Sequence, residues 1–290
     1  MSIDPRKHLG LGPLKKPLFG HNRSHALNAT QKISKPNVQK RKITIGEETF
    51  LDGIDIKPDA FFEKLSSSEI HPQTSQPSVG RFVETYEKLL KTHDSIISVH
   101  ISGKLSATYS SALQAQKEIG NENIKVIDSM NGTLGLGAII YKLAELNQEG
   151  KSFEDLIEES EKLIPNAKFM GLVPTLEYLA KGGRIGKARE FIGSLLKIKP
   201  ILGAVDGEIQ SVGKARTLVK GMDFIVEELK NHKIKTLFIV HANHSERANL
   251  LKEKASQIVD SKNIIIAEFG PVVGTHLGPG AFGVGFISSE

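Results

Sequence analysis

Glycine and histidine are concentrated in one stretch of the chain whose composition suits close contact with a ligand. Residues 269–289 read FGPVVGTHLGPGAFGVGFISS, and His276 is the lone histidine among many glycines there. Glycine lets a backbone approach a ligand closely. Residues 282–287 alternate in a way that predicts a strand, which would place the preceding loop at a sheet edge. The stretch therefore either frames a binding site or is a structural Gly-Pro turn with a surface histidine.

Hydroxyl side chains gather at two predicted helix starts. Residues 74–78 (TSQPS) form a polar loop that begins with Thr74, and residues 102–109 (SGKLSATY), which include Ser106, follow a predicted strand directly. Hydroxyls and free N–H groups at a helix N-terminus bind anions, and the carboxyl end of a strand is the usual ligand position in an α/β sheet. Two such starts predict a carboxylate or phosphate site. The alternative is that these residues only cap helices and turn the chain.

Two arginines are candidates for contact with a phosphate or an acidic partner. Arg184 lies in residues 181–188 (KGGRIGKA), and Arg216 lies in residues 214–217 (KART). The first segment is not a phosphate-binding P-loop, because its spacing is one residue short and Ala188 replaces the hydroxyl that Mg²⁺ requires. Its other basic residues are better explained as a solvated face.

Several catalytic chemistries are excluded or unsupported by the residues. The chain has no cysteine, which excludes disulfides, thiolate metal sites and cysteine nucleophiles. His241 and His244 bracket two residues after a predicted strand, but no third ligand suggests itself, so no metal site is expected. No G-x-S-x-G nucleophile elbow occurs. The pattern is typical of a binding protein more than of a catalyst.

The composition is that of a globular protein, with 290 residues, 39% hydrophobic and 24% charged. No apolar run approaches the roughly 20 residues that span a bilayer, and the basic start, broken by proline and glycine, does not resemble a secretory signal. We therefore expect a cytoplasmic protein.

The positive charge lies at one end. The net charge is +5, and residues 1–42 hold ten of the 38 Lys and Arg residues but one of the 33 acidic residues, so residues 43–290 carry a net charge of −4. The segment lacks a sustained apolar period, which predicts a disordered basic arm. Such an arm could bind nucleic acid non-specifically, but solvated tails are commoner, and we expect no nucleic-acid partner.

Strands and amphipathic helices alternate from Ile43 onward. Short β-branched runs predict strands at 95–101, 124–127, 169–173, 236–240 and 264–267. Apolar residues at helical spacing predict helices around 82–90 and 218–229. Ser78 and Ser152 suit N-cap positions, and Asp155 completes an acidic form of the capping box. The alternation favours α/β layers with a largely parallel sheet.

A change of character near Pro165 marks a domain boundary. A charged helical stretch from Phe153 ends there, and turns rich in Gly and Lys follow. The predicted organisation is an atypical basic segment at 1–42, an α/β domain at 43–165 and a second at 166–290. A ligand cleft is expected between the two α/β domains.

The motifs together resemble those of the DegV family. In order along residues 43–290 they are TSQPS at 74–78, ISGKLSATYSSA at 101–112, VIDS at 126–129, LEYLAKGGRIGKA at 176–188, LLKIKPIL at 195–202, DGEI at 206–209, KART at 214–217 and GTHLGPGAFG at 274–283.

The resemblance implies a bacterial lipid-binding protein without a catalytic residue of its own. Such a protein holds a long-chain fatty acid, for example palmitate or oleate, and presents its carboxylate to a separate ATP-dependent kinase subunit that makes acyl phosphate. By position, Thr74, Ser106 and His276 match the family's carboxylate-binding residues, while Arg184 and Arg216 match arginines linked to the kinase partner. No cofactor, metal, nucleic acid or stable membrane insertion is implied. The alternative is a stand-alone enzyme acting on a small carboxylate or ester.

The chain departs from the family pattern in two places. The family usually has glycine where Ala107 stands, and a methyl group there is tolerable only at an ordinary φ. Family members also open with a strand ending in an Asp-Ser-x-x-Asp-Leu loop, which residues 1–42 lack. The segment is therefore either a true variant without that strand or the product of a reading-frame or start error in the gene.

Overall fold

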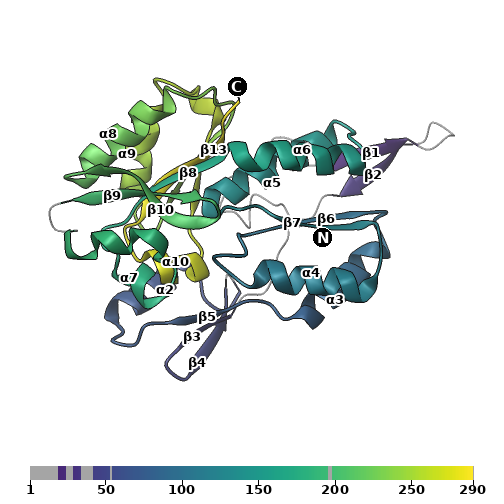
Figure 1. The fold of residues 1–290 in the computed structure, drawn as a ribbon, viewed down its shortest axis with the longest axis horizontal. Coiled ribbons are helices and arrows are strands. Elements are labelled where there is room, and N and C mark those ends of the chain that lie inside the picture. Colours follow the sequence, from purple (N-terminus) through teal and green to yellow (C-terminus); the bar gives the residue numbers. More distant parts are fainter. Residues whose placement is uncertain (1–18, 24–28, 34–41, 53, 195–197, 290) are drawn as a thin grey trace.

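The computed structural model describes residues 19–23, 29–33, 42–52, 54–194 and 198–289. Figure 1 shows two α/β parts that lie side by side, each built of strands covered by helices. The mixed α/β class and the two-part arrangement confirm the fold predicted from the sequence. Within the described ranges, no helix is both long and apolar enough to cross a bilayer.

A parallel strand pair forms the centre of the N-terminal part. β6 (Ile96–His100) and β7 (Ile124–Asp128) pair in parallel along their whole length. α3 (Val79–Leu90) and α4 (Thr108–Ile119) cover one face of this pair (Figure 1). The two aromatic side chains of α3 are buried in the resulting core, which confirms the helical spacing predicted there.

Two further helices cover the opposite face of β6 and β7. They are α5 (Thr133–Gln148) and α6 (Phe153–Asn166). α6 begins at the predicted capping box: the Asp155 N–H donates to Ser152 Oγ at 3.0 Å, and the Ser152 N–H donates to the Asp155 carboxylate at 3.1 Å. α5 also packs on β8 and β13 of the larger sheet, so one helix is shared between the two parts.

A small antiparallel sheet lies below this unit in Figure 1. Its strand order is β4 (Glu48–Leu51), β3 (Lys42–Ile45) and β5 (Gln73–Ser75). The intervening helix α2 (Pro58–Ser67) carries two adjacent phenylalanines, Phe61 and Phe62, that are almost fully buried. This burial fixes α2, and with it β5, against the C-terminal part.

The C-terminal part is built on one six-stranded sheet. Its spatial order is β10 (Glu208–Ala215), β9 (Lys199–Val205), β8 (Ala167–Leu172), β13 (Phe282–Ile287), β11 (Leu237–His241) and β12 (Ile264–Glu268). In this sheet β11 and β12 run parallel, while the other four neighbouring pairs are antiparallel. The prediction of a largely parallel sheet is therefore wrong here. An alternation of strands and helices does not show that β13 returns antiparallel between β8 and β11.

The strand β13 lies in the interior of this sheet. The sequence analysis placed the loop before this strand at a sheet edge, but the strand to which the loop leads is flanked by β8 and β11. The apolar side chains of β13 pack into the core beneath α8 (Leu218–Leu229) and α9 (Ser245–Ala255). Gly285 faces the other way, and a Cβ there would lie 2.3 Å from the Cβ of Leu134, so the glycine is what lets α5 approach the sheet.

The glycine-rich stretch before β13 contains a short helix, where the sequence predicted only a loop. α10 (Pro271–Leu277) has proline in its first turn, where a missing N–H is harmless. It ends at Gly278, whose φ of +75° is a conformation that other residues rarely adopt. α10 packs on α2 and on α7 (Glu177–Lys181), and thereby joins the two parts.

Two 3₁₀ segments complete the fold, η1 (Gly186–Ser194) after α7 and η2 (Ser261–Asn263) before β12. The predicted division at Pro165 remains a prediction; in the structure this proline lies inside α6.

The basic segment at 1–42 is described in part. β1 (Phe19–Arg23) and β2 (Ala29–Ile33) pair as an antiparallel hairpin, and β1 lies beside α5 (Figure 1). The expectation of a disordered arm is therefore wrong for these two strands, because each provides backbone partners for the other. Residues 1–18, 24–28 and 34–41 lie outside the described residues.

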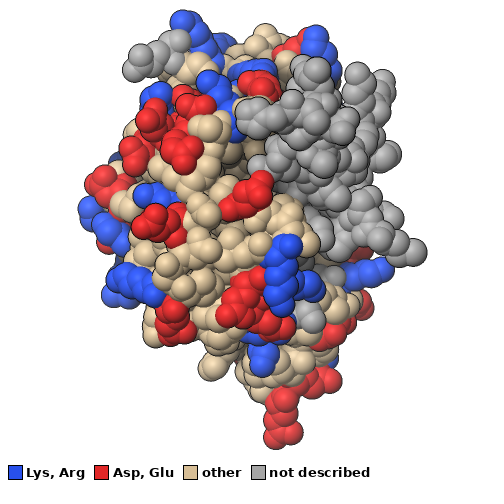
Figure 2. All heavy atoms as spheres, turned by 90° about the vertical axis from the view of Figure 1, so that its right-hand side faces the viewer, with Lys and Arg blue, Asp and Glu red and all other residues tan. Residues whose placement is uncertain are grey.

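Charges of both signs are interspersed on one face of the described part of the protein. On the face shown in Figure 2, basic and acidic side chains lie among one another. The visible part of the body therefore shows no single-sign field of the kind that steers a highly charged ligand.

Candidate functional site

A hydrogen bond between Thr74 and His276 joins the two parts of the protein. Thr74 lies in β5, paired with Ile43 of β3, and His276 lies in the last turn of α10. The Thr74 Oγ1 and His276 Nε2 atoms are 2.9 Å apart although 202 residues separate them in sequence. Two of the three predicted carboxylate-binding residues are thus in direct contact.

The surroundings of His276 keep its imidazole neutral. Burial, followed by the nearby charges of Arg184 and of a second histidine, His71, lowers the pKa of His276 from 6.5 to about 4. Its Nδ1 is buried and has no hydrogen-bond partner within the described part of the chain. Because an orphaned N–H is rarer in proteins than an orphaned acceptor, this environment favours the tautomer with the proton on Nε2. Thr74 Oγ1 then accepts a hydrogen bond from the His276 Nε2–H, and the Thr74 O–H is available to donate to a ligand.

Gly182 gives His276 the space that it occupies. A Cβ at Gly182 would lie 2.2 Å from His276 Nδ1 and 2.9 Å from its Cε1. The φ of Gly182 is −76°, which any residue can adopt, so the glycine is needed for the close approach and not for its backbone conformation.

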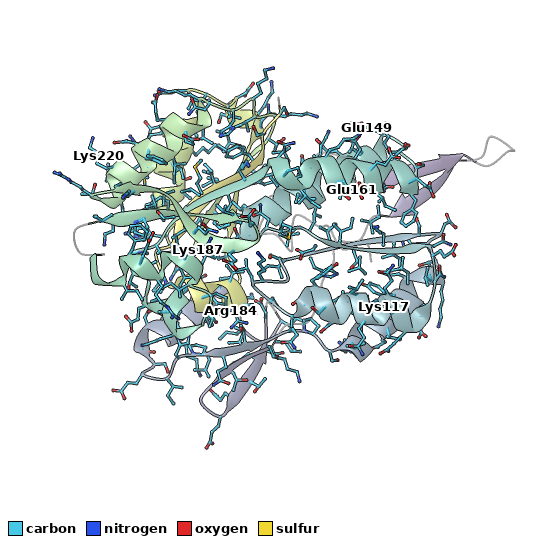
Figure 3. All side chains as sticks on the ribbon, in the orientation of Figure 1. Lys117, Glu149, Glu161, Arg184, Lys187 and Lys220 are labelled. Atoms are coloured by element: carbon cyan, nitrogen blue, oxygen red, sulfur yellow. The ribbon has the colours of Figure 1, made fainter. Side chains whose placement is uncertain are left out.

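Arg184 connects the histidine to the loop after β6. Its Nε donates to the Leu105 carbonyl at 3.2 Å, and its Nη1 donates to the Gly182 carbonyl at 2.7 Å. Figure 3 shows Arg184 where α7, α10 and the small sheet meet. The Arg184 side chain is half-buried, and its positive charge lies near enough to His276 to help lower the pKa of that imidazole.

Ser106 lies in the loop that Arg184 holds. Its Oγ accepts the Thr108 N–H at 3.2 Å and lies 2.8 Å from Thr108 Oγ1, so it closes the turn that opens α4. Among the described residues it makes no direct hydrogen bond to Thr74 or His276. Ala107, at the N-cap of α4, has a φ of −68°, so a methyl group is accommodated where the family usually has glycine.

Arg216 lies apart from this cluster. It follows β10 directly and is exposed, next to Thr217, whose Oγ1 caps α8 by accepting the Lys220 N–H at 3.1 Å. The structure thus brings Thr74, His276 and Arg184 together, and does not bring Arg216 to them. Its predicted contact with a partner remains a prediction.

The sequence analysis missed two residues of the site, His71 and Tyr178. Their rings are 6.1 Å apart, and the Tyr178 ring lies against Gly278, where a Cβ would be 2.2 Å from Cδ2. The His-Pro pair three residues before Thr74 was the available signal, but one histidine before a proline follows no recognisable motif.

An apolar cavity lies beside the cluster. Leu277, the neighbour of His276, lines it together with residues from the centre of the larger sheet. The lining side chains are almost all apolar and include Phe169, Leu172, Leu202, Val240 and Phe269. The free volume is about 40 Å³, little more than a water molecule occupies. A larger ligand would have to displace some of these side chains.

Two further motifs weighed in the sequence analysis are the glycine-rich segment 181–188 and the pair His241 and His244. Residues 181–188 form the end of α7, a turn and the start of η1, and not the strand-loop-helix of a P-loop. The His244 N–H donates to His241 Nδ1 at 3.2 Å, in an open polar cleft at the ends of β11 and β12. No group of three potential metal ligands is found among the described residues.

The fold and site together define a two-part α/β protein in which a hydroxyl, an imidazole and a guanidinium lie beside an apolar cavity. A family model described as "Uncharacterised protein, DegV family" matches residues 35–289. The chain belongs to the DegV family.

Its relatives and structural neighbours agree with this assignment. The chain is 36% identical over 246 residues to a DegV domain-containing protein of Staphylococcus aureus (strain COL), covering 83% of this chain and 88% of that protein. It is 36% identical over 248 residues to Protein DegV of Bacillus subtilis (strain 168), covering 84% and 88%.

Two similar solved structures are described as fatty acid binding. One is a DegV family protein from Thermus thermophilus, with a TM-score of 0.80, 30% identity, and coverage of 86% of this chain and 90% of that one. The other is DegV of Bacillus subtilis, with a TM-score of 0.75, 33% identity, and coverage of 87% and 91%.

A second family model matches the start of the chain. The ribosomal L28 family matches residues 10–51, which overlap the DegV match over residues 35–51. The atypical start noted in the sequence therefore resembles part of another family.

Proposed function

We propose that the protein binds a long-chain fatty acid, with the carboxylate beside Thr74, His276 and Ser106 and the acyl chain in the apolar cavity. The observation that carries this proposal is the Thr74–His276 pair next to that cavity. The fatty-acid-binding relatives support the ligand class. The ligand would be held without a cofactor.

The two halves of such a ligand contribute differently. Each buried methylene is worth about 0.8 kcal/mol, so a long acyl chain contributes on the order of 10 kcal/mol before the cost of ordering it and moving lining side chains. A hydrogen bond to a carboxylate contributes roughly 1.5–3 kcal/mol. The chain therefore supplies most of the affinity, and the hydroxyl and imidazole set the position of the carboxylate.

The carboxylate so held is a substrate for a separate ATP-dependent kinase subunit. In that reaction a carboxylate oxygen attacks the γ-phosphorus of ATP, the bond between the γ-phosphorus and the bridging β–γ oxygen breaks, and ADP leaves with acyl phosphate as the product. Thr74 would orient the attacking oxygen through its hydroxyl. Arg184 lies where it can offset the growing negative charge. The exposed Arg216 would contact the kinase subunit, and the complex would form in the bacterial cytoplasm.

Native mass spectrometry with lipid extraction tests the binding step. We expect the purified protein to carry, or to take up from added palmitate or oleate, one fatty acid per chain. An unchanged mass after incubation with both would contradict the proposal.

A substitution at Thr74 tests the division of roles. Thr74→Val keeps the shape of the side chain and removes the hydroxyl, so we expect a much larger loss of acyl phosphate formation than of fatty acid affinity. Thr85→Val, at an exposed position of α3, is the matched control and should change neither. Equal losses in both assays for Thr74→Val would refute this division.

The sequence analysis expected no nucleic-acid partner, but the match to the ribosomal L28 family gives the start of the chain a second candidate function, RNA binding. Residues 10–51 match the ribosomal L28 family, and residues 1–42 are strongly basic. Basic segments bind nucleic acid with an affinity that falls steeply with salt. We expect ribosomal RNA to bind the full chain, and Gln at Lys15, Lys16, Lys35, Lys40 and Arg41 to reduce that affinity at low salt. RNA binding that is insensitive to these changes would exclude this function.

A further inference from the structure

His71 is a second imidazole beside the carboxylate site, and nothing in the proposed function uses it. It lies three residues before Thr74 and two residues before the first residue of β5. Its Nε2 is buried and has no hydrogen-bond partner among the described residues. A buried ring nitrogen without a partner is unfavourable, unless a ligand or a proton completes its bonding.

Both His71 and His276 lie against the helix α7 and its C-terminal end. Tyr178 and Gly182 are four residues apart, and therefore lie on one face of the helix. The His71 ring lies near the Tyr178 ring, and the His276 ring lies against Gly182. A positive charge on His71 contributes, after burial and Arg184, to lowering the pKa of His276. Among the described residues, one buried nitrogen of each imidazole has no hydrogen-bond partner.

The charges facing this pair come from α7 and from the turn after it. Lys181 disfavours a positive His71, and Glu177 favours it, but these two side chains pair with each other at 2.6 Å. Arg184 disfavours a positive His276. Tyr178 also faces the site, and burial raises the pKa of its phenol, so it stays neutral. Burial is the largest cause that lowers the pKa of both imidazoles, and Lys181 and Arg184 add to it, so without an anion nearby both are neutral at neutral pH.

We propose that His71 is a further residue of the carboxylate site, and that it shares with His276 one proton that enters from solvent when an anionic ligand binds beside Thr74. The inference rests on the proposed function, because the fatty acid carboxylate is that anion. Arg184 and Lys181 disfavour a positive charge on the imidazoles, and the negative charge of the bound anion offsets this effect. A protonated ring nitrogen then donates a hydrogen bond to the carboxylate. His71 acts here as a positioning residue for the carboxylate.

The sign of the pH dependence follows from this arrangement. In the free protein both imidazoles are neutral, and in the complex the two imidazoles together hold one additional proton. Lower pH therefore strengthens binding within a pH window. The window lies between the pKa of the imidazole pair in the free protein and the pKa of the pair in the complex. Within that window, affinity rises by up to about tenfold for each pH unit of acidification.

Calorimetric titration with laurate tests the proposal. Laurate is ionised above about pH 6, so its own protonation does not contribute. In two buffers of different ionisation enthalpy, we expect the wild-type protein to take up about half a proton to one proton per laurate near pH 6. His71→Gln keeps a hydrogen-bond donor but cannot titrate. We expect it to lose at least half of this uptake while its affinity near pH 8 changes less than about threefold.

Two further variants and one direct measurement make the result unambiguous. His71→Phe keeps a ring against Tyr178 and should also lose the uptake, which covers the case in which the Gln variant fails to fold. His93→Gln, three residues beyond the last residue of α3, should leave uptake and affinity unchanged. The imidazole NMR resonances of the wild-type protein should show the pKa of His71 or His276 rising when laurate is added.

The outcomes separate this inference from the proposed function. Laurate binding without proton uptake, or with equal uptake in wild type and both His71 variants, would overturn the role of His71 and leave fatty acid binding intact. Failure of the wild-type protein to bind either laurate or oleate would overturn both.

Discussion

Replacing Gly182 with alanine should disturb the carboxylate site without removing any residue that contacts the ligand. The added methyl would lie 2.2 Å from His276 Nδ1 and 3.1 Å from the Tyr178 carbonyl oxygen. The backbone of Gly182 accepts alanine, because its φ is −76°. The imidazole must therefore move, and the movement lengthens or breaks its hydrogen bond to Thr74.

The magnitude follows from three contributions. Forcing a methyl group into a packed site costs about 1–3 kcal/mol, and the lost hydrogen bond costs about 0.5–1.5 kcal/mol. Replacing glycine with alanine stabilises the folded state by about 0.4–1 kcal/mol, because alanine lowers the conformational entropy of the unfolded chain. The net expectation is a loss of about 1–3 kcal/mol in the free energy of unfolding, which corresponds to several degrees in Tm for a protein of this size.

Thermal unfolding and fatty acid titration together measure this effect. We expect Gly182→Ala to lower Tm and to weaken laurate binding. Gly193→Ala is the matched control, because a Cβ at Gly193 meets nothing within 4 Å, so it should leave both quantities near those of wild type. A Gly182→Ala protein with wild-type Tm and wild-type affinity would refute the close packing of His276 on α7.

Three other predictions concern stability. Ser152→Ala removes the capping box of α6 and should lower the free energy of unfolding by about 1 kcal/mol in urea unfolding; no change would mean that the box is not formed in solution. Tyr86→Phe removes a buried hydrogen bond of 2.8 Å to Ser98 and should cost about 1–2 kcal/mol, measured in the same way. Acidification should destabilise the ligand-free protein. The pKa of His276 is about 4 in the folded state and 6.5 as its unperturbed value. Between these pH values His276 is protonated in the unfolded chain and neutral in the folded protein, so falling pH favours unfolding. The loss reaches up to about 3 kcal/mol below pH 4, and His276→Gln should flatten this dependence in unfolding curves recorded across the range.

Local features of the fold were predictable from the sequence, and the order of the strands was not. The apolar spacing of α3 and the Ser152–Asp155 pair depend on residues a few positions apart, so their patterns are visible in the chain. The antiparallel course of β13 depends on partners more than a hundred residues away in β8. A helix as short as α10, with glycine inside it, has too little periodicity to be recognised.

The candidate site was predictable in part. Residue types and spacing singled out Thr74 and His276, the family resemblance gave both a carboxylate-binding role, and the structure places them in contact. His71 has no counterpart among those motifs, and its place near the site arises from the packing of α10 on both α7 and β5. Arg216 matches a family position in the sequence, but that match did not indicate its place in the structure. Its place depends on the β9–β10 hairpin, which the motif does not reveal.

The interior position of β13 bears on how the protein folds during synthesis. Because β13 joins β8 to β11, the six strands cannot become one sheet until residue 287 has left the ribosome. The α10 helix, which carries His276, is made just before that strand. At about 5–20 residues per second, the strands from β8 to β10 wait several seconds with an open hydrogen-bonding edge. This interval is when the nascent chain is most exposed to mispairing with other chains, and when a chaperone would have the largest effect on its yield.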